Sequence, residues 1–237
     1  MADRLVEYKK LIETFLKSGY RCFPFVDAPP EEKALLLRHD VDFDLFLARD
    51  MAALESEMRV ESTYFVMLRS ASYNLLEKEN SELVSQIGSY GHHISLHFDP
   101  TIYEDFTAGL KKELEVFSDF FGLRPECISI HRPKPFFLEC DTPIGDIRHT
   151  YQSCYTGQIH YFSDSQGEFR HGSPLVSRAF EMQHSIHLLI HPIWWVTNEV
   201  APVDILNSFL DMRIKRFQNH IAANCKPYRS VTAGDYD

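Results

Sequence analysis

A run of three leucines that ends in charged residues constrains the fold of this chain more than any other segment. Leu35-Leu36-Leu37 is followed at once by Arg38-His39 and by two aspartates, Asp40 and Asp42. A continuous apolar run of this kind is typical of a strand buried on both faces, as in a parallel sheet or barrel. Aspartates two positions apart on an extended backbone point to the same side. The segment predicts a carboxylate pair at the carboxyl end of a buried strand, where α/β enzymes hold a metal ion or a catalytic base.

The same residues allow a second interpretation. Asp42 and Asp44 also precede a helical stretch, residues 43–58, and aspartate is a good N-cap residue. This segment by itself leaves both interpretations open.

Length and composition favour one globular domain. The 237 residues are 44% hydrophobic and include 18 Phe and 11 Tyr, ample material for a core. No linker or repeat divides the chain, so we expect a single domain over residues 1–237 with its core at about 34–196. The net charge of −10 without a long basic run argues against nucleic acid or an anionic membrane as partner.

The sequence favours a cytoplasmic protein. The first 16 residues carry charge throughout and lack the apolar core of a signal peptide. The most apolar late run, residues 186–196, is too short to span a bilayer. Five cysteines without a Cys-x-x-Cys pair suit reduced thiols better than a disulfide framework.

Strand-like and helix-like segments alternate along most of the chain. Helical spacing of apolar residues predicts helices near 5–16, 43–58, 75–90, 103–121 and 203–222. Strands are expected at 35–42, 63–68, 93–98, 126–131, 147–152, 159–164 and 185–191. Such alternation implies parallel strands joined by right-handed crossovers, and about seven strands approach the number of an α/β barrel.

The ends of the expected strands share a chemical theme. Acidic residues or histidines stand there: Asp40, Asp42, His97, His131, Asp164 and His191. In a parallel barrel all carboxyl ends lie on one rim, so these distant residues are expected to converge on an active site.

An ordered set of motifs resembles the polysaccharide deacetylase (NodB-homology) family. The matching segments are Arg38-His39-Asp40-Val41-Asp42, Ser62-Thr63-Tyr64-Phe65, Gly91-His92-His93-Ile94-Ser95-Leu96-His97, Ile130-His131-Arg132-Pro133, Tyr161-Phe162-Ser163-Asp164-Ser165 and Leu188-Leu189-Ile190-His191-Pro192. The resemblance implies a distorted (β/α) barrel, and the helices expected near 5–16 and 203–222 would flank it at its N- and C-terminal ends. The resemblance also implies a metal-dependent amide hydrolase.

The resemblance assigns roles to four candidate catalytic residues. Asp40 falls at the position of the catalytic base, and Arg132 at that of the arginine that orients the base. Asp164 resembles the acidic residue that supports this arginine. His191 matches the histidine that protonates the leaving amine.

The metal ligands match the family less completely. The resemblance places Asp42 and His97 at ligand positions, but Thr101 stands where many members have a second histidine. We hypothesise that His131 supplies the missing ligand, which gives a site for a divalent ion, with zinc the first candidate. On a regular strand His131 and Arg132 point to opposite sides, so the hypothesis requires an irregular strand end if both face the site.

These residues predict a hydrolase of a non-peptide C–N bond that removes the acyl group of an amino sugar or another small N-acylated substrate. The alternative is an inactive barrel that binds a carbohydrate or a partner protein, and Thr101 favours that alternative. Trp194 and Trp195 could stack on a sugar or cap a core. His39 is expected behind the strand of Asp40.

Overall fold

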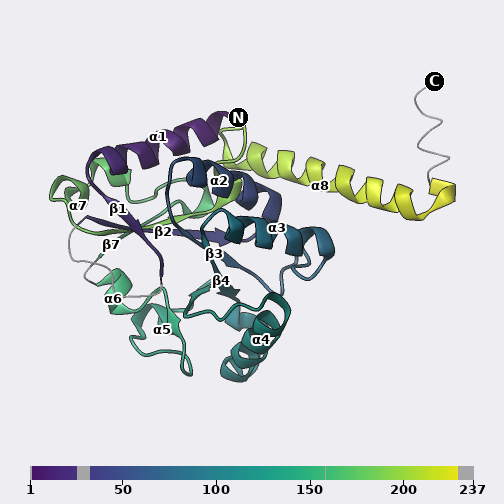
Figure 1. Ribbon diagram of the computed structural model, residues 1–237, viewed down its shortest axis with the longest axis horizontal. Coiled ribbons are helices and arrows are strands. Elements are labelled where there is room, and N and C mark those ends of the chain that lie inside the picture. The colour runs from purple at the N-terminus through teal and green to yellow at the C-terminus, as the bar shows by residue number, and fades with distance from the viewer. Residues whose placement is uncertain (1, 26–32, 158, 229–237) are drawn as a thin grey trace.

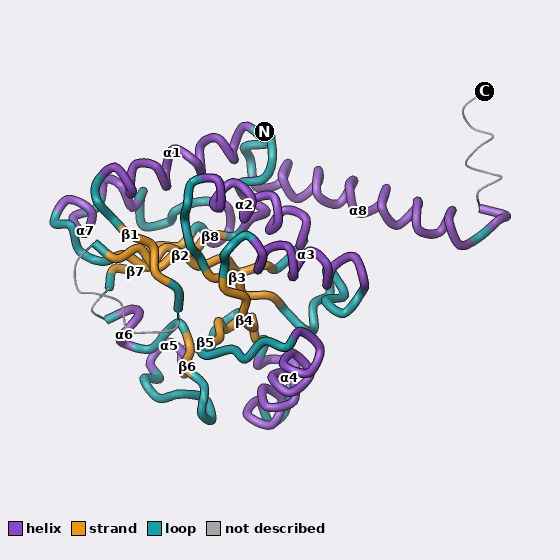
Figure 2. Tube along the Cα trace, in the orientation of Figure 1, coloured by secondary structure: helices purple, strands orange, loops and turns teal. Residues whose placement is uncertain are grey.

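A curled sheet of parallel strands forms the centre of the molecule (Figures 1 and 2). This computed structural model describes residues 2–25, 33–157 and 159–228. The strands are β1 (Arg21–Phe23), β2 (Ala34–Val41), β3 (Thr63–Val66), β4 (His93–Phe98), β5 (Cys127–Ile130), β6 (Arg148–His149), β7 (His160–Ser163) and β8 (Ile186–Ile190). Seven of these described strands follow the order β6-β5-β4-β3-β2-β8-β7, and all their pairings are parallel. The predicted distorted barrel of about seven parallel strands is confirmed as a half-barrel.

Helices flank this sheet. The longer ones are α1 (Asp3–Lys17), α2 (Leu45–Glu57), α3 (Lys78–Ser89), α4 (Phe106–Phe121) and α8 (Pro202–Asn224). The shorter ones are α5 (Pro135–Glu139), α6 (Ser153–Thr156) and α7 (Arg178–Glu181), with 3₁₀ turns such as η1 (Pro100–Ile102) and η4 (Pro192–Trp194). In Figure 1, α1, α2 and α3 lie along one side of the sheet. Each of the five predicted helices is present, within a few residues of its expected ends. Among the described residues, no helix combines the length and the apolar character needed to span a membrane.

The central strand β2 is buried along its whole length. Its alternate residues face two environments. Leu35 and Leu37 pack in the core beneath α1 and α2, whereas Leu36 packs against Phe65 and Tyr155 in a smaller cluster on the inner side of the curl. Since side chains alternate along a strand, Arg38, Asp40 and Asp42 follow Leu36 toward the inner side. The inner side is therefore apolar at one end of β2 and charged at the other.

Sequence reasoning missed one strand and lengthened others. The missed strand is β1, which pairs with the first half of β2. The second half of β2 pairs with β3. Three residues are too few to show a periodicity. The expected strands 147–152 and 159–164 are reduced to β6 and β7, because the chain around them forms short helices and loops.

Candidate metal and catalytic centre

Arg38 and Asp40 form a buried ion pair on the inner side of β2. The Arg38 guanidinium donates two hydrogen bonds to the carboxylate, from Nε to Oδ1 at 2.8 Å and from Nη2 to Oδ2 at 2.6 Å. Burial alone would raise the pKa of Asp40, but the charges of Arg38 and His97 lower it to about 2. Asp40 is therefore ionised at neutral pH. The pairing follows from the sequence spacing, since residues 38 and 40 share one side of the strand.

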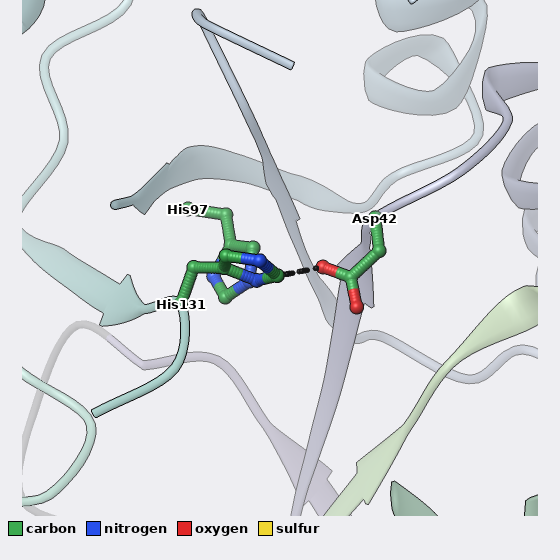
Figure 3. A group of neighbouring side chains, drawn as sticks. All are labelled: Asp42, His97 and His131. Atoms are coloured by element: carbon green, nitrogen blue, oxygen red, sulfur yellow. Dashed lines mark hydrogen bonds and ion pairs between the residues drawn. The ribbon is translucent and has the colours of Figure 1, made fainter. Parts of the chain in front are cut away.

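Asp42, His97 and His131 lie together at the carboxyl ends of β2, β4 and β5 (Figure 3). Oδ1 of Asp42 is 3.1 Å from Nε2 of His97 and 3.2 Å from Nδ1 of His131. The two ring nitrogens are 3.0 Å apart. Ligands bound at about 2 Å to a tetrahedral ion lie roughly 3.3 Å from one another, so the three atoms fit a common cation. The predicted ligand triad is brought together.

The environment of these atoms also suits a cation. Oδ1 of Asp42 is buried and receives no well-directed hydrogen bond. Nδ1 of His97 lies 2.6 Å from the hydroxyl of Ser129. When this nitrogen carries the proton and donates to Ser129, Nε2 keeps its lone pair for an ion, an arrangement typical of metal-ligating histidines.

The choice between a metal ligand and a helix cap is resolved by Asp44. Its carboxylate accepts hydrogen bonds from the backbone N–H groups of Phe46 at 2.8 Å and Leu47 at 3.3 Å, and so it caps α2. Asp42 takes no part in that cap and points toward the two histidines.

His191 follows β8 and approaches the second carboxylate oxygen of Asp42. Its Nε2 is 3.8 Å from Oδ2 of Asp42, and its Nδ1 is 2.6 Å from Oδ1 of Asp164. Asp164 also accepts hydrogen bonds from the backbone N–H of His191 and from Nε1 of Trp195. Burial would lower the pKa of His191, but the neighbouring charge of Asp164 outweighs it and raises the pKa to about 9. The imidazolium is thus oriented with Nε2 toward the site.

The predicted pairing of Arg132 with Asp40 is wrong. Arg38 occupies both oxygens of Asp40, and Arg132 is exposed. The predicted support of Arg132 by Asp164 is also wrong, because the Asp164 carboxylate binds His191 and Trp195 instead.

The backbone explains why Arg132 turns away. Strand β5 ends at Ile130, and the N–H of His131 still donates to the carbonyl of Phe98 on β4, at 2.8 Å. At Arg132 the backbone enters the left-handed region, with φ of 50°. His131 thus keeps the inward direction of the strand, while the next residue leaves it. The irregular strand end therefore brings only His131, and not Arg132, into the site.

Three further expectations have an outcome. Thr101 is no ligand of the triad, since its hydroxyl donates to Asp99 at 2.6 Å. Trp194 and Trp195 are buried in the core, which supports the core-cap interpretation. His39 does pack behind the strand, where it joins a buried network around Glu55 that sequence reasoning missed.

Comparisons with known proteins find similarity in structure only. No family model and no curated protein matches the sequence. A family 4 carbohydrate esterase from Bacillus anthracis matches with a TM-score of 0.45 and 16% identity, over 88% of this chain and 86% of that one. The peptidoglycan deacetylase PdaC from Bacillus subtilis matches with a TM-score of 0.46 and 11% identity, over 84% and 100%.

A third match is described as a family 4 pseudoenzyme from Bacillus anthracis. Its TM-score is 0.44, with 16% identity over 80% of this chain and 65% of that one. Deacetylases of this kind are the proteins that the sequence motifs resemble. With TM-scores below 0.5, the likeness leaves the chemistry to be judged from this chain's own side chains.

Proposed function

We propose that this chain is a metal-dependent hydrolase that removes the acyl group from an N-acylated amino sugar or a related small amide. One observation carries the proposal: the ligand triad is bordered both by an arginine-held carboxylate, Asp40, which is 3.7 Å from His97, and by a carboxylate-held imidazole, His191, which is 3.8 Å from Asp42. An ion site that only stabilised the fold would not need an acid and a base next to it. The class of substrate follows from the resemblance of the sequence motifs.

Asp42, His97 and His131 would hold the ion. When bound, a divalent ion polarises the amide carbonyl and lowers the pKa of water, which makes attack feasible at neutral pH. We propose zinc, because three nitrogen and oxygen ligands with one open position are typical of catalytic zinc. Carboxylate and imidazole ligands also accept other divalent ions.

Asp40 would act as the general base. Arg38 takes one lone-pair direction on each of its oxygens, and a carboxylate offers about four such directions. Oδ2 of Asp40 also lies 3.7 Å from Nδ1 of His97, so the carboxylate borders the ligand triad. It would accept the proton of the attacking water while Arg38 keeps it in position.

His191 would act as the general acid. Its Nδ1 is bound to Asp164, so the proton on Nε2 is the one that faces the site. Donation of this proton to the departing nitrogen would release a neutral amine beside the carboxylic acid. The charge of Asp164 would stabilise the imidazolium before this transfer.

The test is an acetate-release assay over a panel of N-acetyl sugars and nucleotide sugars. Protein stripped of metal is compared with protein given zinc, cobalt, manganese or magnesium. We expect turnover only with a transition metal, and we expect Asp40→Asn to retain the metal while losing at least about 100-fold in turnover. Asp50→Asn changes an exposed carboxylate of α2 and is the matched control. Full activity of Asp40→Asn would exclude the base role.

A carbohydrate-binding barrel without activity is the second candidate. The observation that favours it is Thr101, which turns its hydroxyl to Asp99 where many polysaccharide deacetylases have a metal histidine. This candidate predicts no acetate release with any metal, together with saturable binding of one of the same sugars in calorimetry.

A further inference from the structure

The loop that follows β3 forms a polar pocket next to the strand of Asp42. The pocket has a volume of about 420 Å³ and is lined by residues 68–74 together with Arg213 of α8. The loop is fastened to the end of β2, since the Tyr73 hydroxyl donates to the carbonyl of Val41 at 2.7 Å and the Ser70 hydroxyl to that of Asp42 at 3.5 Å. The pocket therefore lies on the same rim as the ligand triad.

The charge of this pocket is positive. Arg69 and Arg213 are the only charged side chains among the described residues that line it, and no carboxylate is among them. Ser70, Ser72 and Asn74 add hydroxyl and amide groups. In a chain with a net charge of −10, two arginines without an acidic neighbour in one pocket stand out.

Helix α8 supplies Arg213 from a firmly held segment. Phe209, Arg213 and Arg216 lie on one flank of the helix, at spacings of four and three residues. Phe209 is buried, and Arg216 binds Oδ2 of Asp44 at 2.8 Å. Arg213, between these two anchors, is half-buried and makes no ion pair with any described residue. One arginine of this flank is thus neutralised, and the other is left with its charge facing the pocket.

Arg69 is placed by an aromatic ring rather than by a carboxylate. Its guanidinium lies over the ring of Tyr103, 5.2 Å from the centroid, and the Tyr103 hydroxyl donates to Oε1 of Glu113 at 2.6 Å. Within the part of the chain that the structure describes, Arg69 has no ion pair either. A guanidinium has five N–H donors, so contact with one tyrosine leaves several of them for a ligand.

This set of groups matches a phosphate. Arginine binds phosphate through two parallel N–H···O hydrogen bonds, and two arginines together carry a charge of +2. A phosphate monoester carries about −1.5 to −2 at neutral pH and has three acceptor oxygens. A carboxylate has a single charge and two oxygens, so it would leave one of the arginines without compensation.

We propose that the pocket binds a phosphate group of the substrate, so that the preferred substrate is a phosphorylated N-acyl amino sugar. The identity of the sugar rests on the proposed hydrolase function, whereas phosphate binding itself does not. Arg69 and Arg213 would determine specificity at a distance from the amide, and the triad with Asp40 and His191 would act on the acyl group.

Isothermal titration of metal-stripped full-length protein with inorganic phosphate tests the pocket without turnover. Removal of the metal keeps phosphate from binding to the ion instead. We expect saturable binding in roughly the millimolar range. Arg213→Gln and Arg69→Gln should each weaken it by at least about 10-fold, because each removes a charged hydrogen-bonding group. Circular dichroism checks that each variant is folded.

Two further variants serve as controls for charge and geometry. Lys215→Gln removes one positive charge from an exposed position of the same helix, outside the pocket, and should bind phosphate as the wild type does. Arg213→Lys keeps the charge but loses the forked contact, so its affinity should lie between those of the wild type and Arg213→Gln.

Three results would overturn the phosphate pocket. The first is no saturable binding of phosphate up to roughly 100 mM. The second is equal binding by wild type and Arg213→Gln. The third is glucuronate binding as tightly as phosphate with the same dependence on Arg213, because the pocket then recognises a carboxylate.

Acetate release by the metal-loaded protein links the pocket to the reaction. The substrates are N-acetylglucosamine and its 1-phosphate and 6-phosphate. We expect one of the phosphates to have a KM at least about 10-fold lower than the neutral sugar, and Arg213→Gln to remove that preference. Release from all three sugars without such a preference would overturn the pocket's role and leave the hydrolase. Phosphate binding that depends on Arg213, without acetate release from any sugar, would support the pocket and overturn the proposed function.

Discussion

Strand β2 has a cluster of carboxylates and histidines on each of its two sides. On the inner side Asp42 meets His97 and His131. On the outer side His39 meets Glu55 of α2, and His92 lies beside the same carboxylate. Both clusters contain the residue types that bind metal ions, and they lie one strand thickness apart.

The two clusters differ in how their oxygens are satisfied. Oε1 of Glu55 is bound by the Tyr8 hydroxyl and by Nε2 of His39, and Oε2 by the hydroxyls of Ser62 and Tyr64. All these groups are buried. Glu55 therefore has donors on both oxygens and no space for a ligand, and it joins α1, α2, β2 and β3.

The inner cluster is short of donors and reaches the surface. Asp42, His131 and His191 have 16%, 15% and 12% of their side-chain surface exposed. Oδ1 of Asp42 receives no well-directed hydrogen bond and faces two ring nitrogens. Residue type alone therefore does not make a candidate site. The inner cluster differs from the outer one in two respects. Its acceptor atoms converge without hydrogen-bond donors between them, and solvent can reach them.

The largest expected effect concerns metal binding. His97→Ala removes a ligand of the inner cluster and should abolish saturable binding of zinc, a loss of more than about 5 kcal/mol. His92→Ala changes a histidine of the outer cluster and should leave one zinc per chain. Isothermal titration and elemental analysis of metal-stripped, reloaded protein measure both. Zinc bound equally by both variants would break the comparison.

Arg38→Met should be the most destabilising change on the inner side. It leaves the Asp40 carboxylate buried without its cation, which costs roughly 4 kcal/mol of the free energy of unfolding. Chemical denaturation measures this loss. The cost should be smaller at low pH, where Asp40 can be protonated.

The double variant Arg38→Met/Asp40→Leu is its control. It removes the charge together with its partner and should recover most of the lost stability. Equal stability of the single and double variants would mean that packing of Arg38, whose guanidinium lies 5.1 Å from the Tyr151 ring, outweighs the ion pair.

Glu55→Gln probes the outer cluster. Burial would raise the pKa of Glu55, but His39, His92 and Tyr8 lower it to about 2. A carboxyl whose pKa is lowered on folding stabilises the fold above its unfolded value of about 4.5, and this contribution is lost as the pH falls toward 2. At neutral pH we expect Glu55→Gln to cost roughly 3 kcal/mol, and the difference from wild type should shrink below pH 4.5.

The exposed Glu57 of the same helix provides the matched variant. Glu57→Gln should change the free energy of unfolding by less than about 0.5 kcal/mol. A constant Glu55→Gln difference from pH 7 to pH 2.5 would contradict the ionised state of Glu55. Denaturation by urea at several pH values distinguishes the outcomes.

Ser129→Ala should give the smallest effect. The hydroxyl fixes the ring of His97 through Nδ1, and loss of such an orienting partner weakens metal binding by about 10-fold. Fold stability of the metal-free protein should hardly change. A zinc affinity equal to that of wild type would mean that the strand alone orients His97.

Strand geometry predicted that the triad residues would lie near one another, and the motif resemblance then selected Asp42 and His97 as ligands, with His131 added by hypothesis. Asp42, His97 and His131 each end a strand, and parallel strands bring their carboxyl ends to one rim. Side-chain alternation then placed His39 on the opposite side from Asp40. The convergence of the strand ends and the placement of His39 need only the backbone period and the strand ends, whereas the choice of ligands does not follow from them.

The residues that sequence reasoning missed depend on packing between distant elements. The pairing of Arg38 with Asp40 could have been predicted from the same alternation, since residues 38, 40 and 42 share one side of the strand. The motif resemblance instead led us to choose Arg132 as the partner of Asp40. Glu55 had a weaker signal, a carboxylate among the apolar positions of α2. Its partners Tyr8 and Tyr64 come from α1 and β3, and no spacing within one element connects them.

The pairing of β2 with β8 has a consequence for the order of assembly during synthesis. Leu35 pairs with Ile186, so the strand that carries both aspartates lacks its neighbour on that side until most of the chain has been made. All three ligands precede residue 132, whereas His191 and Asp164 come later. A nascent chain can thus gather its ligands before its proton donor exists, while the unpaired leucine edge remains open to aggregation. A ribosome-bound chain that ends before β8 should therefore need a chaperone more than the full-length chain does.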